Sequence, residues 1–307
     1  MRLACLFICL FALLVASCGN SVTGTRATAQ ISPTPTPTHT SQPVVVQTLT
    51  ATPGVSVERS CEDWASWPVI PTVSEKTRQL YGLGQLSGNH PRAFSKIGDG
   101  EISAAWFFTA FDLGEGYYDL GPYQHLAPAI EYFSGSFGRI GMAARRGFNT
   151  HKILDPAQSD PSLCGAHESP LTCEVRLHRP AFAILSLGTN QIWRPDEFDA
   201  GMRQILDILL SYNVVPILSS KGDNLEGDHR INRTIACLAQ EYDVPLWNFW
   251  AAIQPLPAHG LQPDLEHLSY GAPDFGDANA MQTAWTVRNL TALQALDAVW
   301  KGVTAQP

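Results

Sequence analysis

The stretch Ala181-Phe-Ala-Ile-Leu-Ser-Leu187, which runs directly into Gly188-Thr-Asn-Gln191, decides the fold class of this chain. Seven nearly all-apolar residues that end at a glycine are typical of a strand covered on both faces. The segment 214–220 (VVPILSS) has the same character, and shorter candidate strands lie at 93–98 and 244–249. The sequence therefore predicts a sheet that lies inside the domain.

Helical patterns alternate with these strands. Apolar residues at 198, 202, 205, 209 and 212 repeat every three or four positions after Pro195, and we predict further helices at 101–111, 147–154 and 231–241. A last helix carries an apolar stripe at 290, 293, 296 and 300, while residues 155–180 form an excursion with several prolines. This alternation predicts a three-layer α/β/α sandwich with a mainly parallel sheet, in which ligands bind at the carboxyl ends of the strands.

Composition excludes several other classes of protein. The chain has 307 residues, of which 45% are hydrophobic and 16% charged, as expected for a globular protein. Its 28 acidic and 20 basic side chains give a net charge of −8, which argues against nucleic acid as a partner because phosphate binding needs a basic face. No metal-binding, phosphate-loop or dinucleotide fingerprint occurs, so we expect no cofactor.

The N-terminus has the arrangement of a secretory signal peptide, because one arginine precedes the apolar run 3–14. The next residues, Val15-Ala-Ser-Cys18, resemble the bacterial lipobox, which implies lipidation of Cys18 and an extracytoplasmic lipoprotein held at a membrane. The alternative is an ordinary cleaved signal peptide. A Thr/Pro-rich stretch with Arg26 as its only charge follows. We expect a signal peptide at 1–17, a lipidated cysteine and linker at 18–55, and one domain at 56–307.

Four cysteines remain in that domain, and none forms a Cys-x-x-Cys pair. Outside the cytoplasm, Cys164 and Cys173 could close a short disulfide loop, although two free thiols are an equal alternative. Cys237 lies in the apolar part of the helix predicted at 231–241, so we expect it to be a buried thiol.

Polar residues with chemical potential follow the predicted strands in a fixed order. Gly98-Asp99 follows the first strand, Gly147 precedes a helix, and Asn190 follows the strand at 181–187. Near the other end of the chain, Asp264 stands three residues before His267. An aspartate at this spacing can hold one imidazole nitrogen and leave the other to act as a base. Each motif alone is weak, but the order of all four is specific.

In this order the sequence resembles the SGNH (GDSL-like) hydrolases, over roughly residues 93–301. The resemblance implies a flavodoxin-like α/β/α fold and an esterase or acyl-hydrolase that acts on acylated carbohydrate or lipid. It further implies that Gly147 and Asn190 supply the oxyanion hole, and that Asp264 and His267 supply the orienting carboxylate and the base. The expected partners are a small-molecule or glycan ester and, through Cys18, a membrane.

The sequence departs from the family where the nucleophile should stand. The family has Gly-Asp-Ser, whereas this chain has Gly98-Asp99-Gly100. Two smaller departures are Gln191 in place of an aspartate and Leu265 in place of a common glycine. Without a nucleophile, a base and an oxyanion hole cannot form an acyl-enzyme.

Three interpretations of this departure remain open. In the first, Ser103 serves as nucleophile from one turn further along the predicted helix; the alternative is a helix serine that faces solvent or bonds back to that helix. In the second, His267 activates a water molecule, assisted by Glu101 or Asp99. In the third, the domain is a catalytically inactive relative that binds a glycan or acyl ligand because Gly100 replaces the serine.

Other residues give weaker signals. Ser136 is a rival nucleophile, but it misses the Gly-x-Ser-x-Gly pattern by one residue. Trp193 is the tryptophan that we place at the mouth of the pocket. The polar group after the strand at 214–220 could line the same crevice or could be ordinary loop residues; it consists of Lys221, Asp223, Asn224 and His229.

Overall fold

The computed structural model describes residues 60–305, which fall within one unit of the chain, Val57–Pro307. The predicted signal peptide, the predicted lipidation site at Cys18 and the whole of the predicted linker lie outside the described residues. No helix of the described part is long and apolar enough to span a bilayer.

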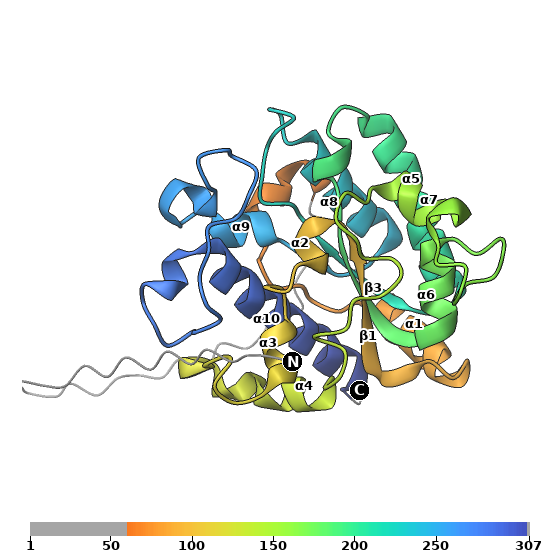
Figure 1. Ribbon diagram of the computed structural model, residues 1–307, viewed down its shortest axis with the longest axis horizontal. Coiled ribbons are helices and arrows are strands. Elements are labelled where there is room, and N and C mark those ends of the chain that lie inside the picture. The colour runs from red at the N-terminus through yellow and green to blue at the C-terminus, as the bar shows by residue number, and fades with distance from the viewer. Residues whose placement is uncertain (1–59, 306–307) are drawn as a thin grey trace, which may run out of the picture. The chain divides into compact units, whose positions relative to one another are not determined.

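A parallel sheet forms the centre of the fold, as the buried strand patterns predicted. Its strands are β1 (His90–Gly98), β2 (Pro180–Ser186), β3 (Val215–Ser219) and β4 (Leu246–Trp247), and they lie in the order β1-β2-β3-β4 (Figure 1). Their pairing is parallel throughout. On the free side of β1, Gly98 forms a parallel bridge with Ala144. This segment takes the place of an outer strand, so the order corresponds to the flavodoxin-like order 2-1-3-4-5.

Helices cover both faces of this sheet, which makes the fold a three-layer α/β/α sandwich. Successive residues of β2 point to opposite faces, so that Ile184 joins one apolar cluster and Leu185 the other. The first face is covered mainly by α1 (Glu75–Leu86), α3 (Thr109–Leu113), α4 (Ala127–Tyr132), α9 (Phe249–Ile253) and α10 (Ala284–Thr304). The second is covered mainly by α5 (Thr150–Leu154), α6 (Pro170–His178), α7 (Pro195–Ser211) and α8 (Arg230–Tyr242).

The helix predicted at 101–111 is wrong as a single element. The structure has a short α2 (Gly100–Ser103), an irregular turn and then α3. Asn289 of α10 explains the break, because its side-chain oxygen accepts from the Phe108 backbone N–H at 2.7 Å and its amide donates to the Trp106 carbonyl at 2.9 Å. These contacts satisfy backbone groups that a continuous helix would pair internally.

Three further elements differ from the sequence prediction. The strand expected at 244–249 is only the two-residue β4, because α9 begins at Phe249. The excursion at 155–180 contains α6, whose Pro170 stands in the first turn and whose Ser169 caps it. Helix α1 was not predicted; its mean hydropathy is low, and it presents few apolar residues to the core.

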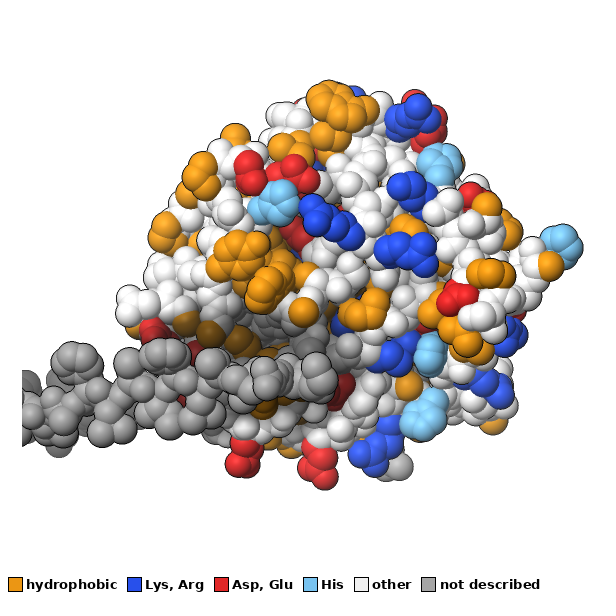
Figure 2. Space-filling view, viewed as in Figure 1, with side chains coloured by type: hydrophobic (Ala, Val, Ile, Leu, Met, Phe, Trp, Pro, Cys, Tyr) orange, Lys and Arg blue, Asp and Glu red, His pale blue; other side chains and the backbone are white. Residues whose placement is uncertain are grey.

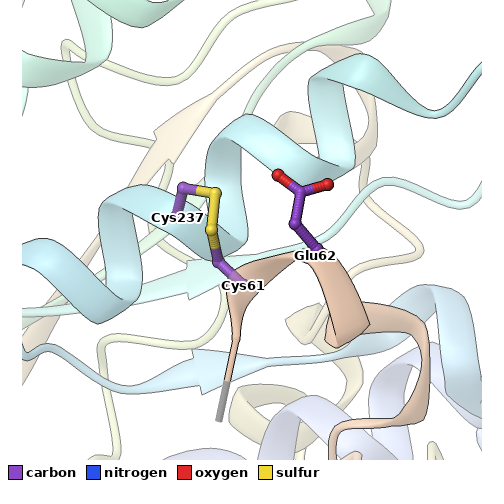
Figure 3. Close-up of side chains that lie close together, drawn as sticks. All are labelled: Cys61, Glu62 and Cys237. Atoms are coloured by element: carbon purple, nitrogen blue, oxygen red, sulfur yellow. A yellow bond between two sulfur atoms is a disulfide. The ribbon is translucent and has the colours of Figure 1, made fainter. Parts of the chain in front are cut away.

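Two disulfides bind the described domain. One joins Cys164 to Cys173, which lies within α6. Our prediction for Cys237 is wrong: it is not a free thiol, since it pairs with Cys61 in the 3-10 helix η1 (Cys61–Ser66). The bond fastens the start of the domain to α8, and Glu62 lies beside the sulfur atoms (Figure 3). This cluster is no metal site, because thiolates bind metal and these sulfurs are bonded to each other.

Candidate functional site

The turn after β1 begins the site. Gly98 has a φ of +149°, and a side chain there would collide with the Ser186 carbonyl, so only glycine fits. The Asp99 backbone N–H donates to the Ser186 carbonyl at 3.3 Å, and the Asp99 carboxylate caps α2 by accepting from the Glu101 N–H at 3.2 Å. This arrangement places Gly100 at the first position of α2, at the carboxyl end of the sheet.

Residues from four distant segments line one pocket of about 590 Å³ beside this turn. Gly100 and Ser103 come from α2, Gly147 from the loop before α5, Asn190 from the turn after β2, and His267 from the loop before α10. The structure thus gathers around one pocket the residues that the sequence order singled out. On the molecular face in Figure 2, histidine, acidic, basic and hydrophobic side chains lie close together.

His267 and Asp264 form a hydrogen-bonded pair. His267 Nδ1 lies 2.8 Å from Asp264 Oδ2, and the His267 backbone N–H donates to Asp264 Oδ1 at 3.0 Å. The backbone N–H groups of His267 and Glu266 lower the pKa of Asp264 to about 2, so this carboxylate is charged at neutral pH. A charged carboxylate on Nδ1 favours the tautomer in which Nε2 is free to accept a proton.

The backbone conformation of Leu265, between Asp264 and His267, shows why a glycine is common at this position. Its φ is +60°, in the left-handed region, and its side chain is mostly exposed. The turn that brings the carboxylate back onto the imidazole therefore requires a conformation that costs a leucine about 1–2 kcal/mol. The departure from the family at this position leaves the pair intact.

Gly147 and Asn190 line the same pocket, and Asn190 contacts Phe148, the residue that follows Gly147. Gly147 has a φ of +77°, and within residues 60–305 its backbone N–H donates to no protein group. The Asn190 amide donates one hydrogen to the Phe148 carbonyl at 3.1 Å, which orients the amide and leaves its second hydrogen available. Two N–H donors that line the same pocket can stabilise a developing oxyanion.

Gln191, which stands where the family usually has an aspartate, holds the start of a neighbouring helix. Its side chain is buried, and its Oε1 accepts from the Thr150 backbone N–H at 3.2 Å and from the Thr150 hydroxyl at 2.9 Å. It thereby caps the start of α5 from the turn that carries Asn190. The Nε2 of the same side chain is buried and has no hydrogen-bond partner within residues 60–305.

The nucleophile position holds no side chain, and no other hydroxyl replaces it in the described pocket. Ser103 lines the pocket, but its hydroxyl donates back to the Gly100 carbonyl at 3.4 Å. The Thr189 hydroxyl donates to Asp223 Oδ2 at 2.6 Å. Ser136 is buried, accepts from the Phe94 N–H at 3.3 Å and does not line the pocket. None of these hydroxyls is paired with His267.

A buried arginine lies beneath the pocket floor, and sequence reasoning missed it. Arg288 of α10 has no exposed surface, and its guanidinium lies 4.6–6.0 Å from the ring centres of four aromatic residues. Its Nη1 is 3.3 Å from Glu101 Oε2, and its Nη2 donates to Ser186 Oγ at 2.8 Å. Arg288 lies outside the apolar stripe predicted at 290, 293, 296 and 300, so no sequence pattern indicated its role.

Burial raises the pKa of the two carboxyl groups at the pocket floor, Asp99 and Glu101. Desolvation, together with the nearby charge of Glu101, raises the pKa of Asp99 to about 7. Desolvation also raises the pKa of Glu101, opposed chiefly by the positive charge of Arg288. Perturbed carboxyl groups in a concave site are typical of functional positions, although structural ion pairs produce them too.

The polar residues after β3 stabilise the turn that carries Asn190. Lys221 is buried, and its Nζ contacts Asp223 Oδ1 at 2.5 Å and Glu226 Oε2 at 2.6 Å. Asp223 in turn holds Thr189, the neighbour of Asn190. These residues therefore stabilise the site without lining it. His229 does not line the pocket either; it packs against Trp64 and Trp250.

The aromatic residues that line the pocket differ from our prediction, which placed Trp193 at its mouth. Trp193 is 83% exposed but is not among the residues that line the pocket. The lining aromatic residues are Trp106, Tyr270 and Trp285. Trp106 and Tyr270 are both largely exposed, and their ring centres are 5.7 Å apart in an edge-to-face arrangement. The break between α2 and α3 places Trp106 there, which explains why the helical pattern did not reveal it.

The sheet order and the ordered set of site residues define an SGNH-hydrolase-like α/β fold. No protein-family model matches the chain, and no curated protein matches it. Among solved structures, it is similar to a GDSL-like lipase from Bacteroides thetaiotaomicron, with 11% identity, 72% of this chain and 97% of that chain covered, and a TM-score of 0.41. It is also similar to a catalytic mutant of an acetylxylan esterase from Geobacillus stearothermophilus, with 14% identity, 68% and 95% coverage, and a TM-score of 0.45.

Proposed function

We propose that this protein binds an ester of an acylated carbohydrate outside the cytoplasm, without forming an acyl-enzyme. The observation that carries the proposal is the single pocket lined by Gly147, Asn190, His267 and Gly100. The first three match the groups that hold and act on an ester carbonyl in SGNH hydrolases. Gly100 removes the side-chain oxygen that would attack this carbonyl.

The pocket combines polar and apolar surface in similar amounts, which suits a short acyl group on a sugar. Most of the lining side chains are polar or charged, and the floor contains Asp99 and Glu101. A long acyl chain needs apolar surface to repay its removal from water. The exposed pair Trp106 and Tyr270 offers the face of an aromatic ring at the rim, on which the apolar face of a sugar ring can stack.

The location outside the cytoplasm is part of the proposal. It is supported by the signal-like N-terminus with Cys18 and by the disulfides Cys61–Cys237 and Cys164–Cys173, since disulfides persist in oxidising compartments. Lipidation of Cys18 would hold the domain at a membrane surface through the linker. Mass spectrometry of the protein purified from membranes tests this, and an unmodified Cys18 would contradict the anchor.

A calorimetric binding experiment tests the ligand class. The full-length protein in detergent is titrated with peracetylated cellobiose, with cellobiose, and with a long-chain monoacyl glycerol. We expect binding of the acetylated sugar, and a roughly fivefold loss in Trp106→Ala because an aromatic contact contributes about 1 kcal/mol. Trp193→Ala is the matched control, since Trp193 is exposed and does not line the pocket. Tighter binding of the acyl glycerol, or equal losses in both variants, would contradict the proposal.

A further inference from the structure

Gly100 differs from the other glycines of the site because nothing in the backbone requires it. Gly98, Gly147 and Gly188 all have positive φ values, whereas Gly100 does not. A Cβ atom added at Gly100 would meet only the Arg146 Cγ at 3.7 Å, which is ordinary van der Waals contact. The fold therefore tolerates a side chain at this position, and the glycine instead enlarges the pocket beside α2.

The enlarged region belongs to a pocket that keeps every other part needed for acyl transfer. His267 is held at Nδ1 by Asp264 at 2.8 Å, so that Nε2 can accept a proton. Gly147 and Asn190 offer N–H donors on the wall, and both residues line the pocket together with Gly100. Serine hydroxyl and water oxygen are similar in size and chemistry, and the same base can activate either of them.

We propose that the protein hydrolyses its ester ligand by direct attack of a water molecule that takes the place of the missing serine hydroxyl at Gly100. This inference rests on the proposed function. As the water oxygen bonds to the acyl carbon, its proton passes to His267 Nε2, and the carbonyl becomes an oxyanion held by Gly147 and Asn190. The bond from the acyl carbon to the sugar oxygen then breaks, and His267 returns the proton to that oxygen. The products are the carboxylic acid and the free hydroxyl group.

The charges around the pocket suit a base that must become positive during the reaction. Asp264 contacts the imidazole directly, and Glu101 is close enough to interact with His267 electrostatically. Arg288 fixes Glu101 from beneath at 3.3 Å, so it is a positioning residue that does not reach the pocket. Asp99, Lys221 and Asp223 also interact electrostatically with Glu101, and the pocket lining contains two further charged side chains, Arg146 and Glu266. The Asp264 carboxylate, which is charged at neutral pH, can stabilise the imidazolium as it forms.

Kinetics with p-nitrophenyl acetate and peracetylated cellobiose test the inference. We expect slow, steady hydrolysis without a burst, and no acyl adduct on the intact protein by mass spectrometry. His267→Ala should lower the rate about 100-fold, because a general base contributes at least this factor. Gly100→Ala should lower it at least tenfold, since the methyl group occupies the position of the water, while binding measured by calorimetry changes less than threefold.

Two controls make the outcome decisive. Peptide mass spectrometry after reaction with p-nitrophenyl acetate should find no acyl group on Ser103, because the Ser103 hydroxyl bonds to its own helix. Glu115→Gln removes an exposed carboxylate outside the pocket lining and should have no effect. An acyl adduct on Ser103, or an unchanged rate in Gly100→Ala, would overturn the inference. Binding without any hydrolysis would also overturn it and leave the proposed binding function standing, whereas loss of both would refute the two together.

Discussion

Replacing Gly100 by serine tests the geometry of the whole site. The serine side chain would begin at a Cβ position whose nearest neighbour is Arg146 Cγ at 3.7 Å, in a conformation that any L-residue adopts. Serine is a better helix residue than glycine by about 0.5 kcal/mol, so we expect Gly100→Ser to fold with a stability within about 1 kcal/mol of the parent. A loss of activity through misfolding is therefore not expected.

The catalytic gain follows from what the pocket already contains. His267 with Asp264 supplies the base, and Gly147 with Asn190 supplies the oxyanion donors. A serine nucleophile that completes such a set accounts for several orders of magnitude in rate. Because the surrounding groups have not been tuned to a serine, we expect only part of this gain, about 100-fold or more in kcat/KM, which corresponds to about 2.7 kcal/mol of transition-state stabilisation.

Stopped-flow hydrolysis of p-nitrophenyl acetate gives the measurement. Gly100→Ser should release a burst of p-nitrophenolate close to one equivalent and should carry an acyl group on Ser at that position, whereas the parent shows neither. The double variant Gly100→Ser/His267→Ala is the control and should lose the burst. A folded Gly100→Ser protein without burst or adduct would refute the alignment of residue 100 with His267, and with it the reasoning on the site.

Three further predictions concern stability. Because burial raises the pKa of Asp99 from an ordinary value near 3.8 to about 7, the domain should lose up to about 4 kcal/mol of unfolding free energy from this group as the pH rises from 4 to 8. Asp99→Asn keeps the cap, and urea titrations should show a gain at pH 8 and none at pH 4. Cys61→Ser should lower the free energy of unfolding by about 5 kcal/mol and Cys164→Ser by about 3 kcal/mol, because their disulfides span 176 and 9 residues and a longer closed loop restricts the unfolded chain more. Equal losses would contradict this dependence on loop length. Leu265→Gly should raise the unfolding free energy by up to about 1 kcal/mol, because φ is +60° there, and a lower melting temperature would speak against this.

Much of the layout could be predicted from the sequence because it depends on local patterns. The strand at 181–187 and the helix after Pro195 are long and strongly patterned, and the structure contains both, as β2 and α7. Asp264 and His267 are only three residues apart, so their contact needs one turn of chain. Where the pattern was short, as for β4, or weakly apolar, as for α1, the prediction was wrong or missing.

The sequence by itself determined the alternation of strands and helices, the order of the site residues along the chain and the loss of the serine at Gly100. Only the tertiary structure decided that Asn289 breaks the helix before Phe108, that Arg288 lies beneath Glu101 and that Cys61 pairs with Cys237. The physical reason is the range of the interactions. The spacing of apolar residues along the chain reflects contacts between residues about one helical turn apart. A buried ion pair or a disulfide instead joins segments that are distant in the sequence and that only the folded sheet and helices bring together.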